Sequence, residues 1–239
     1  MSEWAPKRFW KSAEVTPQGA GWAVTLDGRP VRTPAKTPLV VPTEALARQI
    51  AAEWDAQEAR VNPATMPFTR MSNSALDKVT LQHAEVADML GAYGDADLLC
   101  YRADHPEELV SRQADAWDPV LDWAGAALGA RLVPRLGVIH APQDAAALAR
   151  LSARVHTLDA FRLAAFHDLV SLTGSLILGF ATAERLHDPD TLWSLSRIDE
   201  TWQAEQWGAD EEAQATAEYK RGEFNHAATY FQLANPGAA

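Results

Sequence analysis

Apolar residues recur at every second position near the start of the chain, a spacing that predicts β-strands. The alternating positions are Trp22, Val24 and Leu26. Asp27-Gly28 follows at once, and this dipeptide suits the positive φ angles of a tight hairpin turn. Prolines in the next arm cannot donate hydrogen bonds to a neighbouring strand, so we expect that arm at the edge of a small antiparallel sheet. These prolines are Pro30, Pro34 and Pro38.

The apolar period changes at Thr43, a residue suited to cap a helix. Leu46, Ile50 and Trp54 follow at intervals of four and form one apolar helix stripe. The next segment, "RVNPATMPFTR", is predicted to be a hinge or a domain boundary. We therefore expect an N-terminal β-rich domain with one helix over residues 1–72.

Residues 73–239 have helical period almost throughout, which predicts a larger domain built as an irregular helical bundle and an α+β fold class. One face carries Leu76, Val79, His83, Val86 and Leu90, and a later one carries Leu109, Trp117, Leu121, Ala124 and Leu128. Pro106 suits a first helical turn, whereas Pro119 is expected to kink or split its helix because it lacks an amide donor. The segment "RLVPRLGVIH" is ambiguous, and a short extended pair is one interpretation.

The last third of the chain contains further helix signals. Carboxylates that can meet exposed amides predict helix starts at Asp188-Pro189 and at Asp210, with Gly208 between the last two helices. The longest uncharged run, residues 169–183, is too short and too rich in Ser, Thr and Gly to span a bilayer comfortably. We interpret it as a buried core helix and expect no membrane insertion.

The distribution of charge along the chain indicates which class of macromolecule the protein can bind. The chain of 239 residues has 47% hydrophobic and 22% charged residues, as a folded protein does, and a formal net charge of -11. Residues 1–40 hold six Lys and Arg against three Asp and Glu, and the remainder holds fifteen against twenty-nine. An acidic body repels phosphate backbones, so we expect no nucleic-acid partner and favour a protein with basic patches.

Sequence motifs for cofactors and metals are missing. Neither GxxxxGK[ST] nor GxGxxG occurs, no HExxH pair could place two imidazoles on one helix face, and Cys100 is the only cysteine. Ser175 lacks the GxSxG frame of a nucleophile elbow, so we interpret Gly174 and Ser175 as a close-packing or helix-start feature. We expect no cofactor and no metal, and a packed thiol at Cys100.

Two histidine features leave an enzymatic alternative open. His83 falls on an apolar stripe and is expected to be a hydrogen-bonded core residue rather than a base. His167 and Asp168 are sequence neighbours, which places them about 100° apart on a helix rather than facing each other. Together with the many carboxylates of residues 199–212, His167 and Asp168 keep a carboxylate-based hydrolase among the hypotheses.

The stretch "RIDETWQAEQWGADEEA", residues 197–213, sets two tryptophans among acidic groups. On a helical projection Leu192, Leu195, Ile198 and Trp202 share one face. Asp199 and Glu205 flank that face about 120° apart and Glu200 points away, so they do not converge on one small substrate. We therefore expect no catalytic residue here.

Residues 188–223 hold ten acidic against three basic residues. The segment is either a solvated surface that caps helices or a docking face, since Trp is enriched in binding hot spots and acidic borders select basic partners. As a docking face, its predicted partner-binding residues are Asp199, Glu200, Trp202, Glu205, Trp207, Asp210 and Glu211.

Five stretches in this order resemble one family, the assembly chaperones of F-type ATP synthase that act on the α subunit of the catalytic head. They are "LDGRPVRTPAKTPLVVPTEALARQIAAEWDAQ", "DLLCYRAD", "RQADAWDPVLDW", "GSLILGFA" and "RIDETWQAEQWGADEEA". Their joint occurrence is specific, and they extend over nearly the full length of the chain.

The resemblance implies a β-rich N-terminal domain, a helical C-terminal domain and no catalytic turnover. It further implies binding of the unassembled α subunit and shielding of the surface that later contacts the β subunit. It places a functionally important acidic position at Asp199, where many relatives are expected to carry glutamate. A monomer is expected, in the cytoplasm of a bacterium or in the mitochondrial matrix of a eukaryote. A helical scaffold for another protein partner is the alternative.

Overall fold

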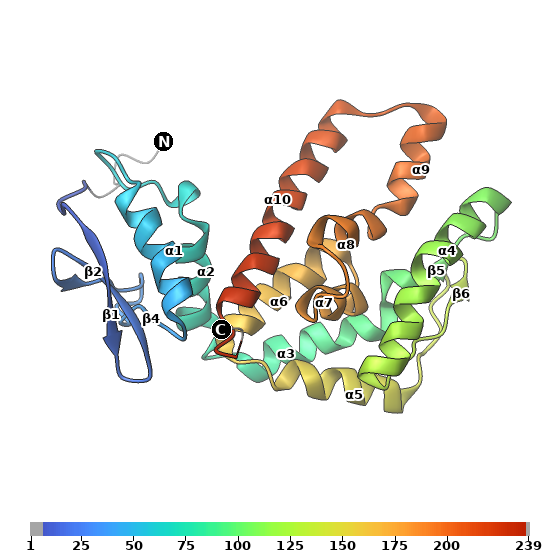
Figure 1. Ribbon diagram of the computed structural model, residues 1–239. Helices are drawn as coiled ribbons and strands as arrows, with labels where there is room; N and C mark the ends of the chain where they lie inside the picture. The colour runs from blue at the N-terminus through green and yellow to red at the C-terminus, as the bar shows by residue number, and fades with distance from the viewer. Residues whose placement is uncertain (1–6, 238–239) are drawn as a thin grey trace. The chain divides into compact units, whose positions relative to one another are not determined.

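A computed structural model of the protein describes residues 7–237, and its α+β fold class agrees with the prediction from the sequence (Figure 1). The chain folds into two compact units, which are described separately. The first contains the described residues up to His83, together with Asp159–Ala165 and the end of the chain from Thr229. The second contains Ala84–Leu158 and Phe166–Ala228. The domain boundary expected between residues 72 and 73 stays a prediction.

A small antiparallel sheet forms the start of the first unit. Its strands are β1 (Ala13–Gln18), β2 (Gly21–Leu26), β3 (Arg29–Pro30) and β4 (Val40–Val41). Strand β2 pairs with each of the other three, and Leu26 lies opposite Arg29 across the predicted hairpin turn. Asp27 and Gly28 have φ angles of 48° and 79°, which only a few residue types adopt easily. Strand β3, which contains Pro30, lies at the sheet edge as expected.

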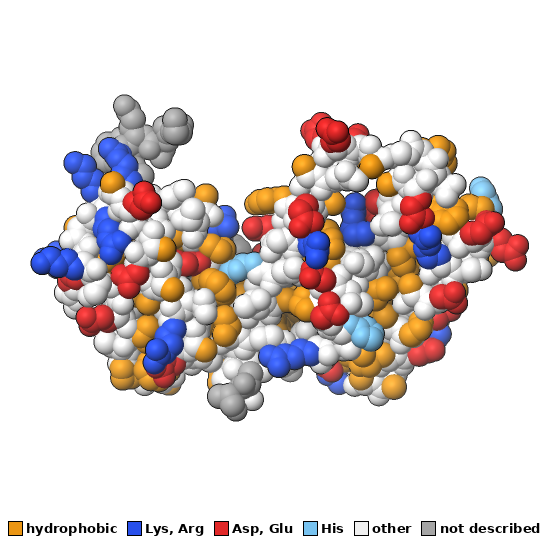
Figure 2. Space-filling view, turned by 45° about the horizontal axis from the view of Figure 1, so that its top comes forward, with side chains coloured by type: hydrophobic (Ala, Val, Ile, Leu, Met, Phe, Trp, Pro, Cys, Tyr) orange, Lys and Arg blue, Asp and Glu red, His pale blue; other side chains and the backbone are white. Residues whose placement is uncertain are grey.

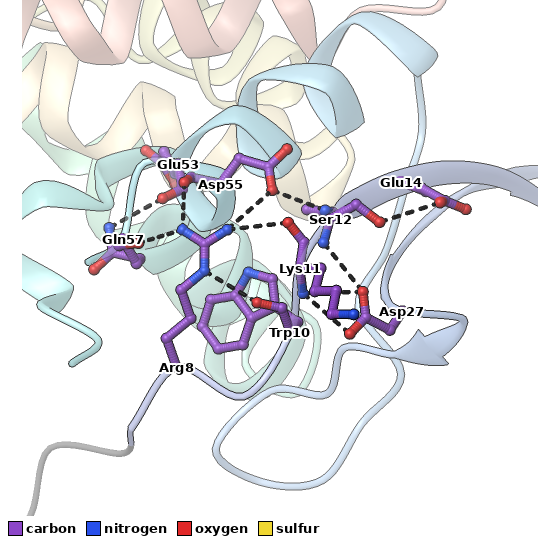
Figure 3. A network of polar contacts seen from close by, with 10 residues as sticks. Arg8, Trp10, Lys11, Ser12, Glu14, Asp27, Glu53, Asp55 and Gln57 are labelled. Atoms are coloured by element: carbon purple, nitrogen blue, oxygen red, sulfur yellow. Dashed lines mark hydrogen bonds and ion pairs between the residues drawn. The ribbon is translucent and has the colours of Figure 1, made fainter. Parts of the chain in front are cut away.

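Asp27 also ties the chain before β1 to the hairpin. Its carboxylate accepts the backbone N–H groups of Lys11 at 3.0 Å and of Ser12 at 3.1 Å (Figure 3). These bonds, the Ser12 bond first, lower the pKa of the Asp27 carboxyl. The turn residue is therefore positioned by its backbone and by its side chain.

Arg8 joins the same segment to the helix that follows the sheet. Its guanidinium donates to the carbonyls of Asp55 at 2.7 Å and of Gln57, and it lies over the ring of Trp10 (Figure 3). That helix, α1 (Glu44–Asp55), begins as predicted, because the Thr43 hydroxyl accepts the N–H of Leu46. The first unit also contains a 3-10 turn, helix α2 and a π-helical turn: η1 (Pro63–Thr65), α2 (Pro67–Ser74) and η2 (Ala75–Val79).

The second unit is mainly helical. Its first elements are α3 (His83–Ala92), η3 (Tyr93–Ala96), η4 (Leu98–Cys100), β5 (Tyr101–Arg102), α4 (Glu107–Trp123), η5 (Ala124–Leu128), β6 (Arg135–Leu136) and α5 (Ala145–His156). The later ones are α6 (Ala160–Thr173), α7 (Leu176–Ala183), α8 (Pro189–Leu195), α9 (Ile198–Trp207) and α10 (Glu211–Leu233). Helices α3, α6 and α10 include residues of both units. The ambiguous segment "RLVPRLGVIH" supplies β6, which pairs in parallel with β5.

The junction between α6 and α7 is the most deeply buried polar feature of the second unit. Gly174 has a φ of 69° and separates the helices, and Ser175 caps α7 by accepting the N–H of Leu178 at 2.9 Å. The buried carboxylate of Asp97 accepts the Ser175 hydroxyl at 2.7 Å and the N–H groups of Ile177 and Leu99 at 3.0 Å each. The predicted helix start at Ser175 and the burial of most of residues 169–183 are confirmed, but the expected single core helix is wrong, because Gly174 divides the run between α6 and α7.

Two further expectations about this region were wrong. Pro119 does not split α4, which runs from Glu107 to Trp123, so the expected split is wrong, while the alternative of a kink stays a prediction. Pro119 lies on the exposed side of the helix, where water can hydrate the carbonyl that loses its donor. His167 and Asp168 do meet, with Nδ1 and Oδ1 2.9 Å apart, because both side chains are long enough to bend toward each other at the helix surface. Both groups are partly exposed.

Candidate functional site

The acidic stretch at residues 197–213 forms two helices that meet at a tight turn. The projection assumed one continuous helix from residue 192, but α8 ends at Leu195 and α9 begins at Ile198 after Arg197 adopts a non-helical conformation. Helix α9 ends at Gly208, with a φ of 93°. Helix α10 then begins where the Asp210 carboxylate accepts the N–H of Ala213 at 3.0 Å. The break at Arg197 changes which side chains of α8 and α9 share a face.

One side of α9 packs on α4. The Gln113 amide, 2% exposed, donates to the Asp199 carboxylate at 2.6 Å, and its oxygen accepts the N–H of Ala103 at 2.8 Å. The Arg112 guanidinium pairs with Glu205 at 2.9 Å and lies over the Trp202 ring, 5.1 Å from its centroid. Asp199, Trp202 and Glu205 are therefore held by one turn of α4.

The other side of α9 faces α10 across an open groove of about 880 Å³. Glu200, Trp207 and Asp210 lie on this groove with residues of α8 and α10. The other lining side chains include Trp193, Arg197, Ala204, Ala213, Ala217, Glu218 and Arg221. Glu200 pairs with Arg197 at 2.7 Å, whereas the Trp207 side chain is 79% exposed at the groove. The groove therefore combines the exposed aromatic side chain of Trp207 with side chains of both charges.

Charged side chains surround the start of α10. Glu211 is exposed in its first turn, where the N–H groups of a helix favour negative charge. In Figure 2 acidic side chains gather at the top of the view, which is the end of the molecule where α10 begins in Figure 1. Further along α10, Arg221 pairs with Asp190 at 2.8 Å and with Glu218 at 3.4 Å. The surplus charge of this surface is negative.

The predicted site residues thus fall into two groups. Asp199, Trp202 and Glu205 contact α4, while Glu200, Trp207 and Asp210 line the groove, with Glu211 beside it. Gln113, Arg112 and Arg221 were missed by sequence reasoning. Arg112 and Gln113 open the stretch "RQADAWDPVLDW", but nothing in the sequence pairs them with residues 197–213. Arg221 lies in α10, outside the quoted stretches.

This arrangement suits contact rather than bond chemistry. Each acidic side chain of α9 has its own partner, an amide for Asp199 and an arginine for Glu200 and for Glu205. The group with a strongly raised carboxyl pKa lies elsewhere: burial raises the pKa of Asp97 to about 6, inside the core. Within residues 7–237, no group of three or more His, Cys, Asp or Glu side chains could hold a metal ion.

Cys100 is packed as expected. Its thiol is buried, and desolvation together with the charge of Asp97 raises its pKa to about 12. As for the membrane, the described part of the chain contains no helix that is both long enough and apolar enough to cross a bilayer.

Comparison with known proteins identifies the family. The structure matches that of a Paracoccus denitrificans Atp12p variant, in which a lysine replaces an aspartate, over 98% of this chain and 100% of the other, with a TM-score of 0.95 and 51% identity. This chain belongs to the ATP12 chaperone family. The family model, described as ATP12 chaperone protein, matches residues 7–125.

Two further proteins are similar to this chain over most of its length. A structure from Agrobacterium tumefaciens is 44% identical, with a TM-score of 0.88 over 95% of this chain and 85% of that one. The mitochondrial protein atp12 of Schizosaccharomyces pombe is 26% identical over 219 residues, 87% of this chain and 75% of the yeast one. The chain is therefore an ATP synthase assembly chaperone and not an enzyme. The acidic helices α9 and α10 belong to a protein that acts by binding.

Proposed function

We propose that this chaperone binds the unassembled α subunit of F-type ATP synthase and shields the surface that later contacts the β subunit. The observation that carries the proposal is the match to ATP12 chaperones along essentially the whole chain. It is supported by the five ordered sequence stretches, which resemble the chaperones of the α subunit.

A physical need exists for such a chaperone. A subunit of an alternating ring exposes an interface rich in apolar side chains until its neighbours arrive, and exposed apolar patches promote aggregation. A chaperone that covers this interface reversibly prevents the aggregation of the subunit. The bound surface must remain available for assembly, so the contact has to be tight enough to protect the subunit and weak enough to be displaced.

We assign the client contact to the surface around α9 and α10. Trp207 offers an exposed aromatic ring, and Asp210 and Glu211 add negative charge beside it. Aromatic side chains dominate binding hot spots, while charged borders select partners of opposite charge. The expected client segment therefore pairs an apolar side chain with lysine or arginine. Asp199 and Glu205 support this surface from the side of α4.

The chain is proposed to act as a monomer. Its compartment would be the bacterial cytoplasm or the mitochondrial matrix, according to its source. In either compartment the client is made or delivered as a separate chain before the ring forms.

Copurification of the untagged α subunit with the tagged chaperone tests the proposal. Wild type should capture the subunit in cells that lack the β subunit, and Asp199→Lys and Trp207→Ser should capture less. Leu81→Ser is the matched control for Trp207→Ser, because both side chains are 79% exposed, and Glu58→Lys controls for charge reversal at an exposed position of the first unit. Because Asp199 accepts from the buried Gln113, unchanged thermal unfolding of Asp199→Lys is needed to assign its loss to the contact. Failure of the wild-type chain to retain the α subunit under these conditions contradicts the proposal.

A further inference from the structure

The loop after η5 displays apolar side chains that the acidic helices do not account for. Leu136, Val138 and Ile139 are 72%, 89% and 83% exposed. Scattered exposed apolar residues are ordinary on a protein surface, but three large ones within four positions concentrate apolar surface in one short loop. We call residues 136–139 the apolar tip.

The base of the loop is held by buried polar groups. The Gln143 side chain, 8% exposed, accepts the N–H of Val133 at 2.8 Å and donates to the carbonyl of Val133 at 2.9 Å. Asp95 accepts the N–H of Gln143 at 2.8 Å and lies 3.0 Å from the His140 ring nitrogen. Both ends of the loop are therefore fixed to the second unit.

The apolar tip itself is shaped by the short parallel strand pair. Leu136 lies opposite Arg102 in the pairing of β5 with β6, and the N–H of Gly137 donates to the Arg102 carbonyl at 2.8 Å. Gly137 has a φ of 75°, a conformation that glycine adopts without strain. A loop fixed in this way loses little conformational entropy when its side chains bind a partner.

The charges around the apolar tip favour a neutral protein surface as its occupant. The tip itself has no charged residue. Arg135 beside it donates to the Pro142 carbonyl at 3.3 Å, while Arg131 pairs with Asp122 at 2.6 Å and His140 with Asp95, so Arg135 is one cation next to the tip that lacks a carboxylate partner among the described residues. Anionic lipid headgroups would need several free cations, and the chain as a whole carries a net charge of -11. Charge complementarity thus selects an uncharged apolar partner rather than a membrane.

The strand pair that shapes the apolar tip and the acidic helix α9 are both anchored on α4. Arg102 of β5 pairs with Asp118 at 2.8 Å, and the Gln113 amide bonds both Ala103, just after β5, and Asp199 of α9. Helix α4 therefore carries the strand pair and α9 at the same time. Figure 1 shows β5 and β6 alongside α4.

We propose that the apolar tip is a second client-binding element, which packs against the apolar interface of the unassembled α subunit while the α9–α10 surface binds a basic segment of it. This inference rests on the proposed function. It adds a contact that is driven by burial of apolar surface and that salt does not screen, beside a charged contact that salt weakens.

The affinity of the full-length chaperone for the isolated α subunit tests the inference. The variant with Leu136→Ser, Val138→Ser and Ile139→Ser should bind at least about tenfold more weakly at low and at high salt, since the lost burial of even one such side chain is worth about that factor. The control with Phe9→Ser and Leu81→Ser removes comparably exposed apolar side chains from the first unit and should bind within about twofold of wild type. Unchanged thermal unfolding of both variants confirms that they fold.

A fluorescent probe reports on the apolar tip directly. Because Cys100 is buried, Val138→Cys supplies one accessible thiol for an environment-sensitive dye. Its emission should shift to the blue on addition of the α subunit. A shift with phosphatidylcholine vesicles, with or without phosphatidylglycerol, but not with the subunit would overturn the inference. So would concentration-dependent dimerisation that the serine variant abolishes.

The outcomes separate the two proposals. Wild-type affinity in the serine variant overturns the role of the apolar tip and leaves the proposed function intact. If the wild-type chain itself fails to bind the α subunit, the proposed function fails and the inference fails with it.

Discussion

The α6–α7 junction and the α9–α10 segment are both built from helices joined at a glycine, yet their side chains are used in opposite ways. At the junction, Asp97 and Ser175 are buried and bond backbone N–H groups that water cannot reach. Along α9 and α10, carboxylates remain at the surface beside the exposed Trp207. Buried polar groups are costly to leave unpaired, whereas exposed ones cost little. The first region is therefore expected to determine stability and the second to determine contact.

The largest expected effect is at the aromatic packing beside the junction. Phe166 is fully buried, with its ring centroid 4.8 Å from that of Phe180. Phe166→Ala leaves a cavity and should lower the free energy of unfolding by about 3–5 kcal/mol. Denaturant unfolding followed by tryptophan fluorescence measures the loss. A change below about 1 kcal/mol would show that this core repacks freely.

Removal of the buried carboxylate should come next. Asp97→Ala leaves the N–H groups of Leu99 and Ile177 without their acceptor, at a cost of about 1–3 kcal/mol for each buried unsatisfied group. The protection of these amides against hydrogen exchange should fall together with the midpoint of unfolding. Intact protection at Ile177 would argue that water replaces the carboxylate.

The pH dependence separates the charge of Asp97 from its hydrogen bonds. Burial raises the folded-state pKa of Asp97 to about 6, against about 3.9 in an unfolded chain. A raised carboxyl pKa gives a stabilisation that is fully present below the unfolded value and is lost as the pH rises through 6. Wild type should therefore exceed Asp97→Asn in stability by a larger margin at pH 4 than at pH 7. The reverse order in unfolding titrations would contradict this assignment.

The smallest effect on stability is expected in the second region. Trp207→Ser should change the free energy of unfolding by no more than about 0.5 kcal/mol, because the side chain is largely exposed. Affinity for the α subunit should nevertheless fall at least about tenfold, as expected for an aromatic hot spot. Calorimetry of unfolding and of binding on the same sample tests both halves. A marked loss of stability would show that Trp207 contributes to the packing of the fold and not only to the contact surface.

Local signals in the sequence were reliable guides to where helices begin. Thr43, Ser175, Asp188 and Asp210 each cap a helix through a side-chain oxygen, as their positions predicted. Asp27-Gly28 likewise forms the hairpin turn. Such features depend on a few adjacent residues, so one sequence is enough to recognise them.

Features that depend on neighbours in space were missed. The projection treated residues 192–205 as one helix and overlooked the break before α9. The angle of about 120° between Asp199 and Glu205 is unaffected, because both lie within α9. What the projection could not show is that Gln113 and Arg112 of α4 bond these two carboxylates. The sequence also left "RLVPRLGVIH" ambiguous, because β6 becomes a strand only by pairing with β5, more than 30 residues earlier.

The sequence by itself determined the α+β class, most helix starts and the acidic surplus of residues 188–223, since these follow from local period, capping and composition. Only the tertiary structure decided that Asp199 and Glu205 turn toward α4 and that Glu200 and Trp207 line a groove against α10. It also decided that Leu136, Val138 and Ile139 remain exposed. Whether an apolar residue is buried depends on which residues pack on it, and those residues are often distant in the sequence.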